Sequence, residues 1–239
     1  MHLFEIDRKS YRGNYKKTSL PSLDLIQWLN DQPLFPKVFW KEAHSPTTRA
    51  SVGSLLSFPH VPHFATSSLS DMRLYGGIRF AKNNCDDKTW SEFPDTAFWL
   101  PQIEISQENG NTEMIQYFLN ENPLENIWQQ FNGSIYTTPN YSLIHRQDVP
   151  DAKRWRDSIS RVLEWITKGD MSKVVLARKT TLQLSNPISA WSLLQELNAT
   201  AQNATLFAFQ LSPSLCFLGA TPEKLFLRED TTTATLKLR

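Results

Sequence analysis

The sequence predicts an α+β protein in which large antiparallel sheets are flanked by helices. In the first half, short apolar runs separated by turn residues are typical of strands. The second half opens on an amphipathic helical pattern, and two later apolar runs are separated by a short polar turn. The first half is thus dominated by strands with helices at its ends, and the second half runs helix, strand, helix, hairpin, strand.

The first half begins with a short predicted helix. Apolar residues spaced among polar ones predict this helix over residues 20–31. Strands are predicted by the short runs at 38–40, 54–58, 78–80 and 97–100. Gly76 and Gly77 precede one of these runs, where we expect a turn or a close approach of another backbone. Residues 111–132 predict one or two helices.

The clearest helix of the second half is predicted between Asp151 and Gly169. Its apolar residues recur at helical spacing and form one face: Trp155, Ile159, Val162, Leu163 and Ile166. Asp151 is suited to cap the start of the helix, and Gly169 to end it. The remaining elements are a strand over 172–181, a helix over 187–198, strands over 204–211 and 215–219, and a strand from 225. The polar segment 146–151 predicts a boundary between residues 1–148 and residues 149–239.

Composition narrows the classes of function. The 239 residues include 25 basic and 24 acidic side chains, so net charge does not favour binding to nucleic acid or to an anionic membrane surface. No stretch approaches the roughly 20 apolar residues of a membrane span, and the first residues lack the apolar core of a secretory signal. Cys85 and Cys216 lie far apart and form no motif, which favours a reduced, cytoplasmic compartment.

Lys173 is the first candidate for chemistry. Period-two alternation in the predicted strand places it on one face with Val175 and Ala177. Burial of such a face lowers the pKa of a lysine from about 10.4, and a neutral lysine can act as a general base. The simpler interpretation is a lysine at the end of a strand, whose amine reaches solvent.

Glu223 is the second candidate. It follows Thr221 and Pro222 at a predicted junction between two strands, and Gly219 lies just upstream. Proline restricts the backbone there, and glycine lets another chain or a ligand come close. A carboxyl group on such a rigid turn is placed to act as a general acid. The simpler interpretation is a turn glutamate without a chemical role.

Together, the two segments resemble the chorismate-binding enzyme family, whose fold is that of anthranilate synthase component I. They read Lys-Val-Val-Leu-Ala-Arg at 173–178 and Gly-Ala-Thr-Pro-Glu at 219–223, with fifty residues from the lysine to the glutamate. The first half is similar to the family as well, at 35–40, 75–80, Trp90, Phe93, 98–101 and Glu104. The resemblance covers about residues 35–229 and points to isochorismate synthases. These enzymes feed menaquinone or siderophore synthesis, and the resemblance favours the menaquinone type.

In that family, a lysine at this position marks the members that add water to chorismate. The resemblance implies that Lys173 is the general base that deprotonates the water attacking C2 of chorismate. It implies that Glu223 is the general acid that protonates the leaving C4 hydroxyl. Residues 1–148 are then an N-terminal α+β subdomain, and residues 149–239 are the start of the catalytic domain. The alternatives are a salicylate synthase, which shares both residues, and a non-catalytic chorismate-family binding module.

The resemblance also implies a Mg²⁺ ion, whose glutamate ligands lie in a part of the family domain beyond position 239. We therefore expect no metal site within residues 1–239. His60 and His63 are expected to be structural or exposed, because Pro62 argues against a regular helix there. Because the family domain continues beyond position 239, the resemblance implies an incomplete fold. We therefore expect an inactive fragment. Its exposed sheet edges and apolar faces predict self-association or binding of a completing chain.

Overall fold

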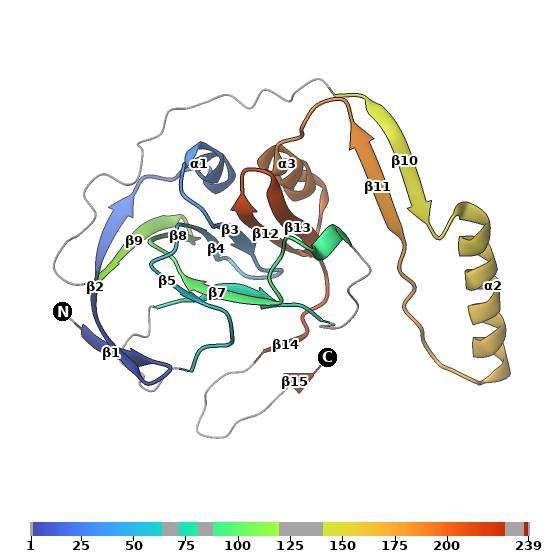
Figure 1. The fold of residues 1–239 in the computed structure, drawn as a ribbon, viewed down its shortest axis with the longest axis horizontal. Coiled ribbons are helices and arrows are strands. Elements are labelled where there is room, and N and C mark those ends of the chain that lie inside the picture. The colour runs from blue at the N-terminus through green and yellow to red at the C-terminus, as the bar shows by residue number, and fades with distance from the viewer. Residues whose placement is uncertain (1, 64–71, 81–87, 120–140, 228–236, 239) are drawn as a thin grey trace. The chain divides into compact units, whose positions relative to one another are not determined.

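The computed structural model describes residues 2–63, 72–80, 88–119, 141–227 and 237–238 (Figure 1). The chain divides into two compact units, each with most of its residue contacts inside itself. The first unit contains residues 1–136 and 190–239, and the second contains residues 137–189. The division predicted after residue 148 stays a prediction. Residues 120–132, part of a segment for which the sequence predicts helix, lie outside the described residues.

An eight-stranded antiparallel sheet forms the centre of the first unit. Its strands, in spatial order, are β1 (His2–Ile6), β2 (Lys9–Leu20), β9 (Asn111–Leu119), β8 (Ile103–Glu108), β4 (Thr48–Val52), β3 (Lys37–Lys41), β12 (Thr205–Ser212) and β13 (Leu215–Thr221). Each of these neighbours pairs antiparallel. Strands from distant parts of the chain are neighbours in this sheet: β3 pairs with β12. The predicted α+β class with a large antiparallel sheet is confirmed.

Two helices, α1 (Leu25–Asp31) and α3 (Ala190–Thr200), pack on one face of this sheet. The Asp24 carboxylate caps α1 by accepting hydrogen bonds of 2.9 and 3.0 Å from two amides of its first turn. On α3, the Trp191 indole N–H donates to Oε1 of Gln210 at 2.8 Å. The core between helices and sheet is apolar and fully enclosed, and it includes Leu25, Ile26, Trp28, Leu29, Phe39, Ala50, Val52, Ile103, Ile105, Met114, Trp191, Leu194, Leu206 and Ala208.

The opposite face of the large sheet contacts a second, smaller sheet. This sheet has the order β5 (Leu56–Phe58), β7 (Thr96–Leu100), β6 (Tyr75–Ile78). Tyr75 and Trp99 from it pack with Val38 of β3. At Gly76, an added Cβ would lie 2.1 Å from the carbonyl oxygen of Ala97, so only glycine fits against β7. The close backbone approach predicted at Gly76 is confirmed. The remaining described elements of this unit are η1 (Lys88–Trp90) and the paired β14 (Phe226–Leu227) and β15 (Lys237–Leu238).

Residues 111–119 form strand β9 rather than the helix that the sequence predicts. Asn109 and Gly110 connect β8 to β9 with φ angles of 49° and 82°. Two consecutive positive φ angles give the tight turn whose twist matches that of a two-stranded hairpin. The Asn-Gly pair is the strongest short-range signal for such a hairpin. It favours a strand rather than a helix directly after the turn.

The second unit consists of β10 (Leu143–Val149), α2 (Ala152–Lys168) and β11 (Lys179–Leu184), with the two strands paired antiparallel. The Asp151 carboxylate accepts amide hydrogen bonds of 3.0 and 2.9 Å at the start of α2. Gly169 ends the helix with a φ angle of 78°. Both predicted caps are therefore confirmed. The amphipathic pattern of α2 is also as predicted.

Lys37 is a buried lysine in the first unit, and its amine satisfies the end of α1. Its Nζ donates a 2.7 Å hydrogen bond to the carbonyl oxygen of Leu29. The same ammonium lies 4.8 Å from the ring centre of Phe35 and 5.9 Å from that of Trp191. Burial lowers the pKa of Lys37 to about 8, although the charge of Asp31 opposes this shift. The lysine side chain thus combines a helix cap with a costly buried charge.

We expect this burial to change how stability depends on pH. Between pH 8 and 10.5 the unfolded chain keeps the Lys37 proton while the folded chain loses it, so the unfolding free energy rises with pH. From this shift, the unfolding free energy of the wild type should rise by about 3 kcal/mol relative to Lys37→Met across that range. Urea titrations of both proteins at several pH values measure the difference. The Cys216 thiol, whose pKa burial raises to about 12, acts in the opposite sense but equally in both. A difference independent of pH would contradict this expectation.

Candidate active site

Glu223 lies on the turn that leads from β13 to β14. The Thr221 hydroxyl accepts a hydrogen bond of 3.2 Å from the Glu223 amide and donates one of 3.4 Å to the Glu223 carbonyl oxygen. Pro222 stands between them and restricts the backbone. The predicted junction between two strands is confirmed. The side chain of Glu223 is exposed, so its carboxyl group is accessible from solvent.

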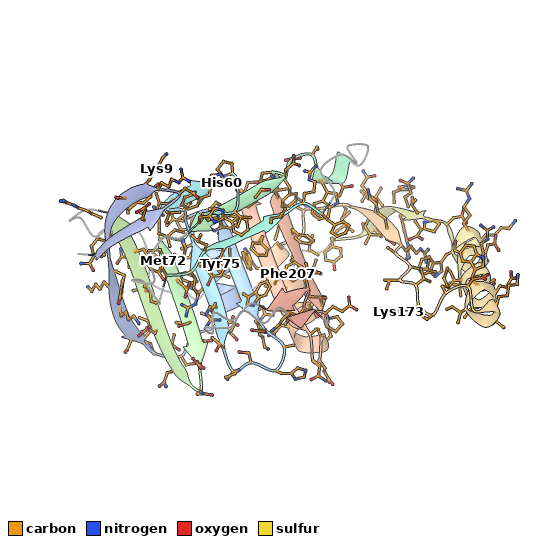
Figure 2. The ribbon with its side chains drawn as sticks, turned by 90° about the horizontal axis from the view of Figure 1, so that it is seen from below. Lys9, His60, Met72, Tyr75, Lys173 and Phe207 are labelled. Carbon is orange, nitrogen blue, oxygen red and sulfur yellow. The ribbon has the colours of Figure 1, made fainter. Side chains whose placement is uncertain are left out.

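Aromatic side chains pack together beside β13 around Phe207, which is labelled in Figure 2. A Cβ added at Gly219 would lie 3.1 and 3.3 Å from two ring carbons of Phe207, so this ring lies against the backbone of β13. The Phe207 ring centre is 6.3 Å from that of Trp40 and 5.1 Å from that of Phe217. Glycine at 219 thus permits the close approach that the sequence predicts. The partner is a side chain of the neighbouring strand β12.

Lys173 lies in an extended segment between α2 and β11, and its side chain is exposed (Figure 2). The strand predicted over 172–181 begins only at Lys179. The strand therefore starts later than predicted, and the exposed Lys173 side chain fits the simpler interpretation of a lysine whose amine reaches solvent. The reason is the partner strand: β10 ends at Val149, opposite Lys179, and the chain then turns at Pro150 into α2. No described strand runs beside residues 173–178 to continue the pairing.

The two predicted site residues belong to different units. Lys173 lies in the second unit, and Glu223 lies in the first. Both are exposed in their own units. Their pairing as base and acid in one site stays a prediction.

The described residues do not fit a magnesium site. Among them, no three or more His, Cys, Asp or Glu side chains are grouped so that they could hold a metal ion. His60 instead places Nε2 2.8 Å from the carboxylate of Asp7, which also accepts the His63 amide at 2.9 Å. The hydrogen bond from the His63 amide, followed by that with His60, lowers the pKa of Asp7. These contacts link the 60–63 segment to the turn between β1 and β2.

One buried polar cluster has no counterpart in the site predicted from the sequence. The side chain of Glu104, on β8, is completely buried. Its carboxylate accepts hydrogen bonds of 2.8 Å from Arg73 and 2.8 Å from the Tyr75 hydroxyl. Burial raises the pKa of Glu104, although the charge of Arg73 and the bond from Tyr75 act in the opposite direction. The cluster connects the large sheet to the smaller one, and we interpret it as structural.

The described part of the chain has no helix that is both long and apolar enough to cross a membrane. Its fold has counterparts among solved structures. The menaquinone-specific isochorismate synthase MenF from Escherichia coli matches 90% of this chain with a TM-score of 0.70 and 20% identity. The match covers 52% of the MenF chain. The protein therefore has the α+β fold seen in this class of enzyme.

The family follows from the sequence. The family model described as "Chorismate binding enzyme" matches residues 60–238, a span that includes both Lys173 and Glu223. The chain belongs to the chorismate-binding enzyme family.

Curated relatives that are similar to this chain at low sequence identity include isochorismate synthases. Isochorismate synthase MenF of Haemophilus influenzae is 24% identical over 220 residues, which are 89% of this chain and 48% of that protein. The chloroplastic isochorismate synthase of Catharanthus roseus is 27% identical over 189 residues, which are 72% of this chain and 33% of that protein. The chain thus spans half or less of the length of these relatives.

Proposed function

We propose that this chain supplies the acid and the base of an isochorismate synthase, which converts chorismate to isochorismate. The single observation that supports this most is the family match, because it spans both predicted site residues in one segment. The relatives named isochorismate synthase, in bacteria and in plants, support the same reaction. Supply of isochorismate to menaquinone synthesis is the finer proposal, and it follows the name of the Escherichia coli structure.

The proposed chemistry is a displacement in which the ring double bonds shift. Lys173 takes a proton from water, whose oxygen forms the new bond to C2 of chorismate. The bond between C4 and its hydroxyl breaks, and Glu223 donates the proton with which the hydroxyl leaves as water. Base and acid must lie on opposite sides of the ring system for this to occur. The exposed positions of both side chains in their units leave them accessible to such a substrate.

We further propose that turnover needs a polypeptide equivalent to the part of the relatives that this chain does not match. The second unit presents apolar side chains that its own elements leave uncovered. Leu163 on α2 is 58% exposed and Val175 beside Lys173 is 77% exposed, whereas Val162 is the one buried residue of α2. An amphipathic helix normally buries its apolar face, and a two-stranded hairpin is marginal alone. Self-association through the same face is the alternative outcome.

The test is an assay of the purified 239-residue chain with chorismate, alone and co-expressed with the unmatched part of the Haemophilus influenzae relative. Chromatography of the products separates isochorismate from salicylate and pyruvate. We expect isochorismate only when both polypeptides are present. Size-exclusion chromatography of the chain alone measures self-association.

Other outcomes would change the proposal in distinct ways. Isochorismate made by the chain alone would remove the need for a second polypeptide. Salicylate with pyruvate would indicate a salicylate synthase. A rise in melting temperature with chorismate, but no product in either preparation, would favour a non-catalytic binding module. Neither product nor stabilisation would contradict the proposed function.

A further inference from the structure

We propose that Glu42 is a positioning residue for Glu223 and acts through an ion pair with Lys224. The proposal rests on the assignment of Glu223 as the general acid. Glu42 directly follows β3, and Lys224 directly follows Glu223. The Glu42 carboxylate and the Lys224 ammonium form both a hydrogen bond and an ion pair. This contact ties the turn that carries Glu223 to a strand that is not its neighbour in the sheet.

The residues on either side of Glu42 are held in place, because Lys41 belongs to strand β3 and pairs with its neighbours in the sheet. Lys41, just before it, donates from Nζ to Oδ1 of Asn198 on α3 at 2.9 Å. Ala43, just after it, donates its amide to the hydroxyl of Thr205 at 3.1 Å. Thr205 is the first residue of β12. Glu42 is therefore a fixed point from which its carboxylate reaches the turn.

The sheet brings the two partners to one end. Strands β3, β12 and β13 lie side by side in that order (Figure 1). Lys41 pairs with Leu206, and Thr221 pairs with Thr205. The last residues of β3 and β13 therefore lie at the same end of the sheet, beside the first residues of β12. The ion pair thus links the ends of β3 and β13 past the start of the strand between them.

Two sets of contacts then hold the turn, and they act differently. The hydrogen bonds of Thr221 shape the turn from within. The ion pair fixes the turn relative to the sheet. A general acid must lie within hydrogen-bond reach of the atom it protonates, and a displacement of about 1 Å can lower the rate strongly. Glu42 therefore affects the reaction without touching the substrate.

The exposure of the pair sets the size of the expected effect. The Lys224 side chain is 46% exposed and that of Glu42 is 31% exposed. Ion pairs with this exposure shift an equilibrium by a small factor, roughly two- to five-fold. The same factor is expected for the fraction of time that the turn spends away from its position on the sheet.

The first measurement is hydrogen exchange of the Glu223 and Leu225 amides in the 239-residue chain. We expect Glu42→Gln to speed exchange of these amides by roughly two- to five-fold. The charge-swapped variant Glu42→Lys with Lys224→Glu should restore the slower exchange. Glu196→Gln, at an exposed position on α3, is the matched control and should leave these amides unchanged. Exchange unaffected by Glu42→Gln would overturn the proposal.

The second measurement is turnover, in whichever preparation converts chorismate. Glu42→Gln should lower kcat by roughly two- to five-fold and leave KM unchanged, and the swapped pair should restore kcat. Faster exchange with unaltered kcat would also overturn the positioning role, because the pair would then be structural only. Absence of turnover in the wild type would contradict the proposed function instead, and the exchange result would still decide whether Glu42 holds the turn.

Discussion

Replacing Lys173 by alanine is expected to lower the turnover of chorismate by about 10²- to 10⁴-fold, and Glu223→Gln is expected to do the same. The first substitution removes the group that accepts the proton of the attacking water. The second keeps the shape and the hydrogen-bonding capacity of the side chain but removes its acidic proton. Both residues are exposed, so neither change should disturb packing. A loss in kcat without unfolding would therefore report on chemistry.

The measurement is kcat at saturating chorismate in the preparation that contains both polypeptides, with far-ultraviolet circular dichroism as the check on folding. Lys153→Ala, at an exposed lysine of α2, is the matched control for Lys173→Ala and should keep turnover near that of the wild type. Removing both groups together should cost less than the product of the single losses if base and acid serve one step. Turnover close to normal in either single variant would exclude that residue from the proposed roles.

Glu104→Ala is expected to lower the unfolding free energy by about 3 kcal/mol. The substitution takes away the carboxylate that binds both Arg73 and the Tyr75 hydroxyl. Breaking a buried ion pair typically costs about 3–5 kcal/mol, and the lower end applies because Arg73 is 37% exposed and can regain water. Urea unfolding measures the loss. Glu108→Ala, an exposed position at the end of the same strand, should change the free energy by less than about 0.5 kcal/mol.

The pH dependence gives an independent check on this cluster. Because the folded-state pKa of Glu104 is raised above its ordinary value of 4.5, the folded chain holds the proton more tightly than the unfolded chain. The wild type should therefore lose stability relative to Glu104→Gln as the pH rises from 4.5 through the raised pKa, and level off above it. A wild type that gains stability over this range relative to Glu104→Gln would show that the ion pair outweighs burial.

Features set by neighbouring residues could be predicted from the sequence. Asp151 and Gly169 mark the ends of α2 because a capping carboxylate and a left-handed glycine act within one turn of the helix. The hairpin at Asn109 and Gly110 is equally local, because an Asn-Gly pair adopts the positive φ angles that its turn requires.

Features set by distant partners could not be predicted in the same way. Lys173 has residues typical of a strand around it, yet pairing stops where β10 ends, six residues further along the chain at Lys179. The burial of Glu104 depends on Arg73 and Tyr75, which come from another part of the chain. Glu42 and Lys224 are 182 positions apart, and neither residue stands out locally. Family resemblance supplied the candidate base and acid, but it did not supply these supporting contacts.

The discontinuity of the first unit has a consequence for the order in which the protein forms. Strands β12 and β13 leave the ribosome after the whole second unit, yet they complete the sheet beside β3. The contact between Ala43 and Thr205 closes a loop of 162 positions. Such long-range closure is slow, and it leaves β3 as an open edge during synthesis. Nascent chains that end before about residue 212 should therefore depend most on chaperones, because β12 is not yet present to pair with β3.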